Sequence, residues 1–167
     1  MAVDLDEVRK MCELLMVANQ GDHFHALGIK VTDIQRGSVT MELGYSDDIV
    51  GNPETGVIHG GVITALLDSC CGFSASTVLE ELALTPTIDL RIDHLGPAEP
   101  HKPIYAVGEV YRLSRYVIFT RAVAHQGDKN RPVAQAVGNF SRMEKGTFSE
   151  FRDAMLAAYD KLIGGKS

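Results

Sequence analysis

Hydrophobic residues dominate one continuous stretch of the chain, from Val57 to Val78. Nearly every position there is apolar or small, and the Gly60-Gly61 pair near its start is typical of a turn. The pattern predicts a helix from near Gly61 to about Val78, roughly 27 Å long at 1.5 Å per residue. Because a helix that is apolar on all sides is buried on all sides, other elements must wrap around it.

Alternating hydrophobic and polar residues elsewhere in the chain predict that the wrapping elements are strands. The strands are expected at Ile29–Ile34, Val39–Tyr45, Thr87–Ile92, Ile104–Leu113, Val117–His125 and Val133–Arg142. Short turns at Arg36–Ser38, Ser114–Arg115 and Gly127–Asn130 would connect antiparallel neighbours. The fold class is therefore α+β, with an antiparallel sheet around a long central helix.

Both ends of the chain show a helical period. At the start, Leu5, Val8, Cys12 and Leu15 form one apolar stripe, and a second stripe at the end consists of Phe148, Phe151, Met155, Ala158 and Leu162. Thr147 and Glu150 have the spacing of a capping box for the second helix. That helix would cover part of the domain or seal a subunit contact. Without an internal repeat or linker, residues 1–167 are expected to form a single domain.

Charge and composition exclude several classes of function. The formal net charge is −6 and no run of basic residues occurs, so we expect no nucleic-acid partner. The longest apolar stretch contains His59 and Asp68, which favours a protein core over a membrane span. The acidic start of the chain does not resemble a signal peptide. A cytoplasmic protein is expected.

The three cysteines, Cys12, Cys70 and Cys71, suit a reducing compartment. Cys70 and Cys71 are adjacent on the predicted central helix, without the spacing of a metal site or a CxxC motif. Buried cysteines usually act as small hydrophobic residues, so neither is expected to be a nucleophile. We expect no metal and no cofactor.

Asp68 is the one acid inside the apolar stretch. Its neighbours on the same helical face are small, including Thr64, Ala65, Cys71 and Gly72, which leaves room for a ligand or a second helix beside the carboxylate. An Asp satisfied by a Ser or Thr neighbour, or simply exposed, is the alternative. Burial of an unpaired charge costs several kcal/mol, so we favour a functional carboxylate.

The Gly60-Gly61 pair precedes this helix and could have a chemical role. Backbone N–H groups at a helix N-terminus approach an electron-rich atom closely when no side chain intervenes. Such donors form the oxyanion hole of acyl-transfer enzymes. Taken alone, the pair would more often be an ordinary tight turn.

Together, His59-Gly60-Gly61, six intervening residues and then Asp68 resemble the PaaI-like acyl-CoA thioesterase family of the hotdog fold. The segment TPTIDLRIDHLGPAE, Thr85 to Glu99, is also similar to the strand that follows the central helix in that family. One position departs from the pattern. Many members have Asn six residues before the His, whereas this chain has Pro53 there. Asn52 could take the role, Glu54 or Thr55 could substitute, or the role is vacant.

The resemblance implies a site and an assembly. Asp68 would be the general base or the nucleophile, and Gly60, with help from Gly61, would polarise the thioester carbonyl. His59 would orient the loop or contact substrate, and Thr87 could hold the water. The implied active unit is a homodimer, with the glycine turn of one subunit facing the acid of the other, and homotetramers are usual.

The acyl-CoA substrate implied by the resemblance would contact further residues. Thr64 and Asn52 are candidates for substrate binding, and arginines offer planar donors for the CoA phosphates. The candidate arginines are Arg91, Arg112, Arg115 and Arg121.

Two further functions remain open at this stage. A hotdog module that binds an acyl thioester without cleaving it would explain Pro53 at the Asn position. A dehydratase on the same fold ranks last, because its usual acid-His arrangement differs from this one. The acyl group is also open, since aryl-acetyl, medium-chain and short branched groups all suit an apolar lining.

Overall fold

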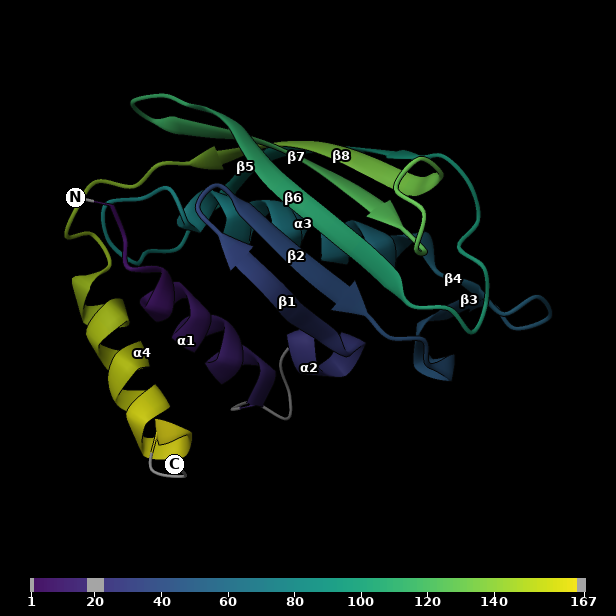
Figure 1. Ribbon diagram of the computed structural model, residues 1–167, viewed down its shortest axis with the longest axis horizontal. Coiled ribbons are helices and arrows are strands. Elements are labelled where there is room, and N and C mark those ends of the chain that lie inside the picture. The colour runs from purple at the N-terminus through teal and green to yellow at the C-terminus, as the bar shows by residue number, and fades with distance from the viewer. Residues whose placement is uncertain (1, 18–22, 165–167) are drawn as a thin grey trace.

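The computed structural model describes residues 2–17 and 23–164 (Figure 1). In chain order the elements are α1 (Leu5–Val17), α2 (His23–Leu27), β1 (Ile29–Gln35), β2 (Ser38–Leu43), the short 3-10 helix η1 (Asp47–Ile49), β3 (Val50–Asn52), β4 (Val57–Ile58), α3 (Gly60–Ser76), β5 (Thr87–His94), β6 (Ile104–Leu113), β7 (Val117–His125), β8 (Pro132–Ser141) and α4 (Ser149–Leu162).

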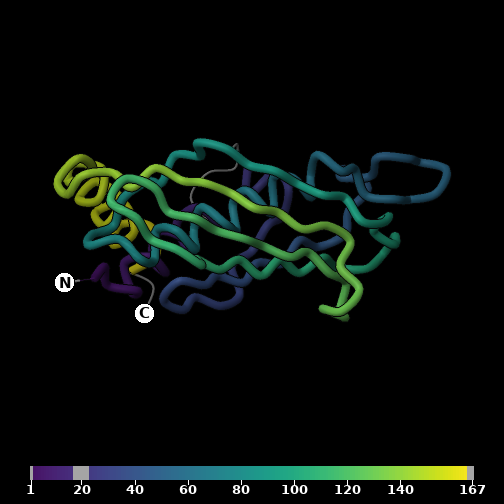
Figure 2. Tube along the Cα trace, turned by 90° about the horizontal axis from the view of Figure 1, so that it is seen from above, coloured from purple at the N-terminus to yellow at the C-terminus, as the bar shows by residue number. Residues whose placement is uncertain are grey.

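An antiparallel sheet curves around α3, as the hydrophobic pattern predicts. Its strand order is β1-β2-β6-β7-β8-β5, and α3 packs against one face of it (Figures 1 and 2). Leu66, Leu67, Cys70 and Cys71 on α3 are fully buried. The long and largely apolar helix α3 is therefore the centre of the hydrophobic core.

Close contact between helix and sheet depends on one glycine. A Cβ added at Gly108 on β6 would lie 2.8 Å from the Cys70 carbonyl oxygen and 2.7 Å from Ser74 Oγ. Only a residue without a side chain lets the backbone approach this closely. Ser74 Oγ also accepts a hydrogen bond from the Val39 amide at 3.1 Å. These contacts fix the position of α3 relative to β2 and β6.

The strands agree with their predicted ranges to within a few residues. Three elements were not predicted: α2, η1 and the β3–β4 hairpin. Helix α2 has five residues and η1 has three, and the strands β3 and β4 have three and two. Segments this short contain less than one full cycle of a burial pattern or little more, so periodicity cannot reveal them.

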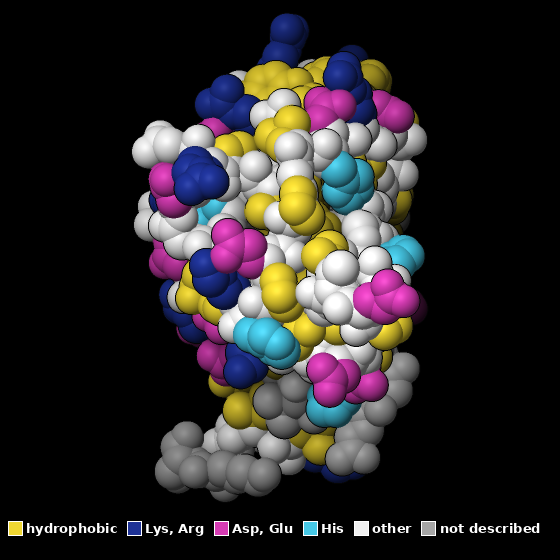
Figure 3. All heavy atoms as spheres, turned by 90° about the vertical axis from the view of Figure 1, so that its right-hand side faces the viewer, with side chains coloured by type: hydrophobic (Ala, Val, Ile, Leu, Met, Phe, Trp, Pro, Cys, Tyr) yellow, Lys and Arg dark blue, Asp and Glu magenta, His cyan; other side chains and the backbone are white. Residues whose placement is uncertain are grey.

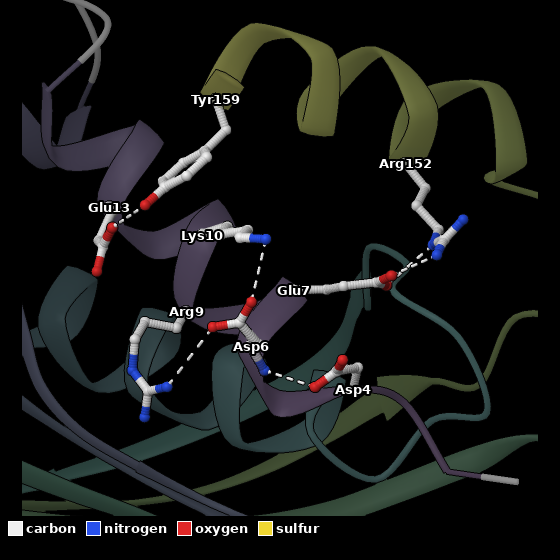
Figure 4. Close-up of polar contacts among 8 residues, drawn as sticks. All are labelled: Asp4, Asp6, Glu7, Arg9, Lys10, Glu13, Arg152 and Tyr159. Atoms are coloured by element: carbon white, nitrogen blue, oxygen red, sulfur yellow. Dashed lines mark hydrogen bonds and ion pairs between the residues drawn. The ribbon is translucent and has the colours of Figure 1, made fainter. Parts of the chain in front are cut away.

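The terminal helices α1 and α4 pack against each other at one end of the molecule (Figures 1 and 4). Arg152 on α4 forms an ion pair with Glu7 on α1, and the Tyr159 hydroxyl donates to Glu13 at 2.8 Å. The predicted capping box is wrong. The helix begins at Ser149, and its N-cap residue Phe148 makes no side-chain cap hydrogen bond. Thr147 instead belongs to the preceding turn, where its amide donates to the Glu144 carbonyl.

Candidate active site

The start of α3 is built by His59, Gly60 and Gly61. His59 is the N-cap residue, and its Nδ1 atom accepts a hydrogen bond from the Gly61 amide at 2.9 Å. The Gly61 N–H is therefore engaged within the chain. The Gly60 N–H is one of the first-turn donors that an α-helix leaves without an intrahelical partner. Of the two glycines, Gly60 is the better placed to donate to a ligand.

His94, at the end of β5, lies against Gly60. A Cβ added at Gly60 would be 3.3 Å from His94 Cε1 and 3.6 Å from its Nε2. The imidazole is exposed, so it could reach a ligand held at the start of α3. Sequence reasoning missed this residue. His94 lies within the segment that carries the family resemblance, but nothing in its local pattern shows that β5 ends beside the helix N-terminus.

Asp68 and Thr87 form the second part of the site. The Thr87 hydroxyl, on the first residue of β5, donates to Asp68 Oδ1 at 3.0 Å. The Asp68 side chain is half-buried, so the carboxylate is partly open to solvent rather than sealed in the core. Its polar partner comes from a neighbouring strand and not from the helix itself. The hydrogen bond fixes one carboxylate oxygen and leaves the other available.

An apolar cavity of about 660 Å³ begins at this carboxylate. Four helices, the segment before β5, and one residue each of β5 and β8 contribute to it. Its lining residues are Met11, Leu14, Leu15, Phe24, Asp68, Ser69, Gly72, Phe73, Ser76, Ala83, Leu84, Thr85, Pro86, Thr87, Phe140, Phe151, Ala154 and Met155. A cavity of this size, with a single acid among hydrophobic side chains, is typical of a small-molecule site.

The structure does not bring Gly60 and Asp68 together within one chain. Both lie on α3, eight residues apart, which separates them by about 12 Å along the helix axis. A carbonyl group polarised by the Gly60 amide is therefore out of reach of the same chain's carboxylate.

The other predicted substrate contacts have local partners. Thr64 Oγ1 donates to the Gly60 carbonyl at 3.1 Å, inside the first turns of α3. The Asn52 side-chain oxygen accepts from the Glu54 amide at 3.0 Å, within an exposed turn. Neither contact points to a ligand.

The four candidate arginines are spread over exposed positions. Arg91 pairs with Asp93 at 3.0 Å, and Arg121 pairs with Glu109. Arg112 and Arg115 lie over the rings of Phe119 and Tyr116. On the end of the molecule opposite α4, basic and acidic side chains alternate with histidines and apolar groups (Figure 3).

The class of protein follows from the fold and this site. A sheet wrapped around a long helix, with a helix-terminal glycine turn and an acid farther along that helix, defines the hotdog thioesterase architecture. Residues 55–133 match the thioesterase superfamily, a stretch that includes the glycine turn, Asp68 and Thr87.

Known proteins support this assignment. A protein from Pseudomonas aeruginosa has a crystal structure that is 44% identical, with a TM-score of 0.71, over 82% of this chain and 99% of that chain. The medium/long-chain acyl-CoA thioesterase YigI of Salmonella typhimurium is 26% identical over 62% of this chain and 75% of its own length. A variant of the phenylacetic acid degradation protein PaaI from Thermus thermophilus shares the fold, at 23% identity and a TM-score of 0.63, over 72% of this chain and 97% of that chain.

The chain contains a thioesterase superfamily domain, matched over residues 55–133. The resemblance to the PaaI-like hotdog thioesterases is thus confirmed at the level of family and fold. Within the part of the chain that the structure describes, no helix is long and apolar enough to cross a membrane.

Proposed function

We propose that this protein hydrolyses an acyl-CoA thioester to the free acid and CoA. The observation that carries the proposal is the Asp68 carboxylate, held by Thr87 at the head of an apolar cavity. The acyl chain would enter the cavity and place its thioester carbon near the carboxylate. A polar reactive group beside an apolar pocket is the arrangement that such a substrate requires.

Asp68 has two possible roles in the reaction. As a general base it takes a proton from water, and the resulting hydroxide adds to the thioester carbon. As a nucleophile it adds to that carbon itself, and water cleaves the acyl-enzyme anhydride afterwards. In both routes the carbon–sulfur bond breaks, the CoA thiolate leaves and is then protonated, and one water is consumed. Thr87 would orient the carboxylate, or the water beside it.

The Gly60 amide would stabilise the negative charge that develops on the thioester oxygen. Because it lies about 12 Å along α3 from Asp68 of its own chain, the Gly60 that serves one Asp68 must come from a second subunit. We therefore propose a homodimer as the minimal active unit, with a homotetramer as its further assembly. His94 would then join the same shared site, and His59 would hold the turn through its bond to the Gly61 amide.

The remaining features of the proposal are less specific. Arg91 and Arg115 are exposed and could turn toward CoA phosphates, and Thr64 or Asn52 could contact the substrate across the subunit boundary. The free, buried thiols of Cys12, Cys70 and Cys71 suit the reducing cytoplasm. The whole chain would act as one domain.

A second candidate is a module that binds an acyl thioester without cleaving it. The observation in its favour is Asn52, whose side-chain oxygen is engaged with the Glu54 amide in its own turn. Pro53 stands at the expected Asn position, and the Asn52 oxygen is already used in its own turn, so that oxygen is not available to a thioester or a water.

Release of CoA thiol from a panel of acyl-CoA thioesters distinguishes the two functions. Wild type and Asp68→Asn are compared, because Asn keeps the size of the side chain and removes its charge. Thioesterase chemistry predicts release by wild type and a fall of at least about 100-fold in the variant, as expected when the group that carries the chemistry is lost. Binding of acyl-CoA by wild type without any thiol release would favour the binding module.

A further inference from the structure

The cavity beside Asp68 extends along α3 toward the C-terminal end of that helix. Asp68, Gly72 and Ser76 all line it and recur every four residues, so they lie on one face of α3. From Asp68 to Ser76 the helix rises by about 12 Å. The cavity is therefore elongated, with the carboxylate at one end.

Helices α1 and α4 form the wall across from this face of α3. Met11, Leu14 and Leu15 of α1 line the cavity, and so do Phe151 and Met155 of α4. The two helices lie side by side (Figure 1), held by the Glu7–Arg152 and Glu13–Tyr159 contacts (Figure 4). Residues outside the stretch that matches the family thus define one whole wall of the cavity.

A third wall is aromatic. Phe24 on α2 meets Phe73 on α3 edge to face, with ring centroids 5.6 Å apart, and both rings line the cavity. This arrangement of two rings is favourable in itself, so it can form without a ligand.

Three hydroxyls in the walls, those of Ser76, Thr85 and Thr87, have partners within the protein. Ser76 Oγ donates to the Phe73 carbonyl at 2.8 Å, and Thr85 Oγ1 donates to the Gly72 carbonyl at 2.9 Å. The Thr87 hydroxyl is used by Asp68. Among the described lining residues, Asp68 carries the only charge. The cavity therefore suits a ligand that is apolar along its length. A hydroxyl group on a ligand would lose its hydrogen bonds to water there and find few partners in the walls.

We propose that this cavity binds the straight aliphatic chain of a medium-chain acyl thioester, and that α1 and α4 set the accepted chain length. The proposal rests on the thioesterase function above and names its acyl group. An extended chain of single bonds advances about 3.3–3.6 Å per three bonds, so 12 Å accommodates about ten bonds. The expected optimum is an acyl group of about 8 to 12 carbons.

The volume agrees with this length. An engineered cavity of about 150 Å³ holds benzene, with its six carbons. The cavity here, at about 660 Å³, has room for a longer chain. Each buried methylene should tighten binding about fourfold. Affinity would therefore rise with chain length until the wall is reached.

Ala154 on α4 offers a clean test. It lines the cavity but is exposed, so a larger side chain can fill the cavity without overpacking the core. Ala157 is equally an exposed alanine of α4, and it lies outside the described lining. The experiment measures kcat/KM for straight-chain acyl-CoA thioesters from acetyl to palmitoyl, on wild type, Ala154→Trp and Ala157→Trp.

The expected wild-type optimum falls at about 8 to 12 carbons. Ala154→Trp should shift it to shorter chains, with a loss of about tenfold or more for dodecanoyl-CoA and little change for butyryl-CoA, because about two to three buried methylenes are lost. Ala157→Trp should keep the wild-type profile. An optimum at acetyl-CoA, a clear preference for phenylacetyl-CoA, or an Ala154→Trp profile equal to wild type would overturn the proposal.

A binding measurement separates this proposal from the thioesterase function on which it rests. Displacement of a fluorescent fatty acid by dodecanoic acid is recorded on the same three proteins. If no thioester is cleaved but Ala154→Trp alone weakens displacement by about tenfold, the cavity still binds an aliphatic chain and the enzymatic function fails. If thioesters are cleaved but displacement is equal in all three proteins, the acyl chain lies elsewhere.

Discussion

Thr87 is the residue whose role is easiest to isolate. Its hydroxyl donates to Asp68, and a hydrogen bond to a charged group contributes about 1.5–3 kcal/mol. Thr87→Val keeps the shape and the preference for a strand but removes the donor. We expect kcat for thioester cleavage to fall about 10- to 100-fold in this variant.

The matched variant Thr87→Ser retains a hydroxyl and should recover most of that loss. Thermal unfolding of both variants checks that the fold is intact. A folded Thr87→Val protein with wild-type kcat would show that the contact is structural only.

The cysteines provide a second prediction at the same scale. Burial raises the pKa of the Cys12 thiol to about 12 and that of Cys71 to about 11, and it raises the pKa of Cys70 as well. At pH 8 all three groups should stay protonated and unreactive in the native protein, because thiolate forms only as the pH approaches the pKa. Titration with a disulfide reagent should find no fast thiol before unfolding and all three afterwards. A fast-reacting thiol in the native protein would reopen the case for a cysteine nucleophile.

Residue identities could be predicted where chemistry and spacing coincide. Asp68 stands out because a charge inside an apolar run is costly, whatever the surrounding fold. The Gly60-Gly61 pair becomes informative only together with that acid and its spacing. His94 and the cavity residues of α1 and α4 do not stand out, because they contact the site only through tertiary packing. Thr87 is an intermediate case. The family resemblance singles it out as a site residue, but no local pattern of β5 predicts its hydrogen bond to Asp68.

Among the elements, β5 combines an unpaired edge with an exposed large hydrophobic residue. It is the last strand of the sheet order, so its outer edge has no neighbouring strand among the described residues. Ile88 on β5 is 59% exposed. An unpaired edge with exposed hydrophobic residues is a surface on which a second chain can pair.

We expect the second subunit to pair at this edge, so Ile88→Lys, which places a charge there, should convert the proposed dimer into a monomer. Tyr116→Lys is the matched control, since Tyr116 is also 59% exposed but lies in the turn between β6 and β7. Molar mass from light scattering during gel filtration measures the outcome. A dimer that survives Ile88→Lys and dissociates with Tyr116→Lys would place the interface elsewhere.

Periodicity predicted the long elements and not their partners. Strands of six to ten residues that pack one face on α3 carry a clear alternation, so their ranges could be read closely. The apolar stripe on α4 predicted a helix correctly, but it does not indicate which element packs against that helix. In the structure most of its apolar residues remain partly open, and only Met155 is buried among the described residues of α4.

At the scale of the whole molecule, the central claim is that each active site is shared between two subunits. Two substitutions separate its halves. Asp68→Asn removes the acid, and Gly60→Pro removes the backbone N–H at the first helical position, where proline is well tolerated. His59 already has an extended backbone, as the residue before a proline requires. Gly60→Ala, which keeps the N–H, is the control.

Mixing the two inactive variants under conditions of subunit exchange is the most direct measurement. In a mixed dimer, one of the two sites has both substitutions and the other has neither, so an equal mixture should recover about a quarter of wild-type thiol release. Each variant alone should stay inactive. If Asp68 and Gly60 acted within one chain, every site in the mixture would carry a defect. Full subunit exchange with no recovery of activity would therefore contradict the shared site.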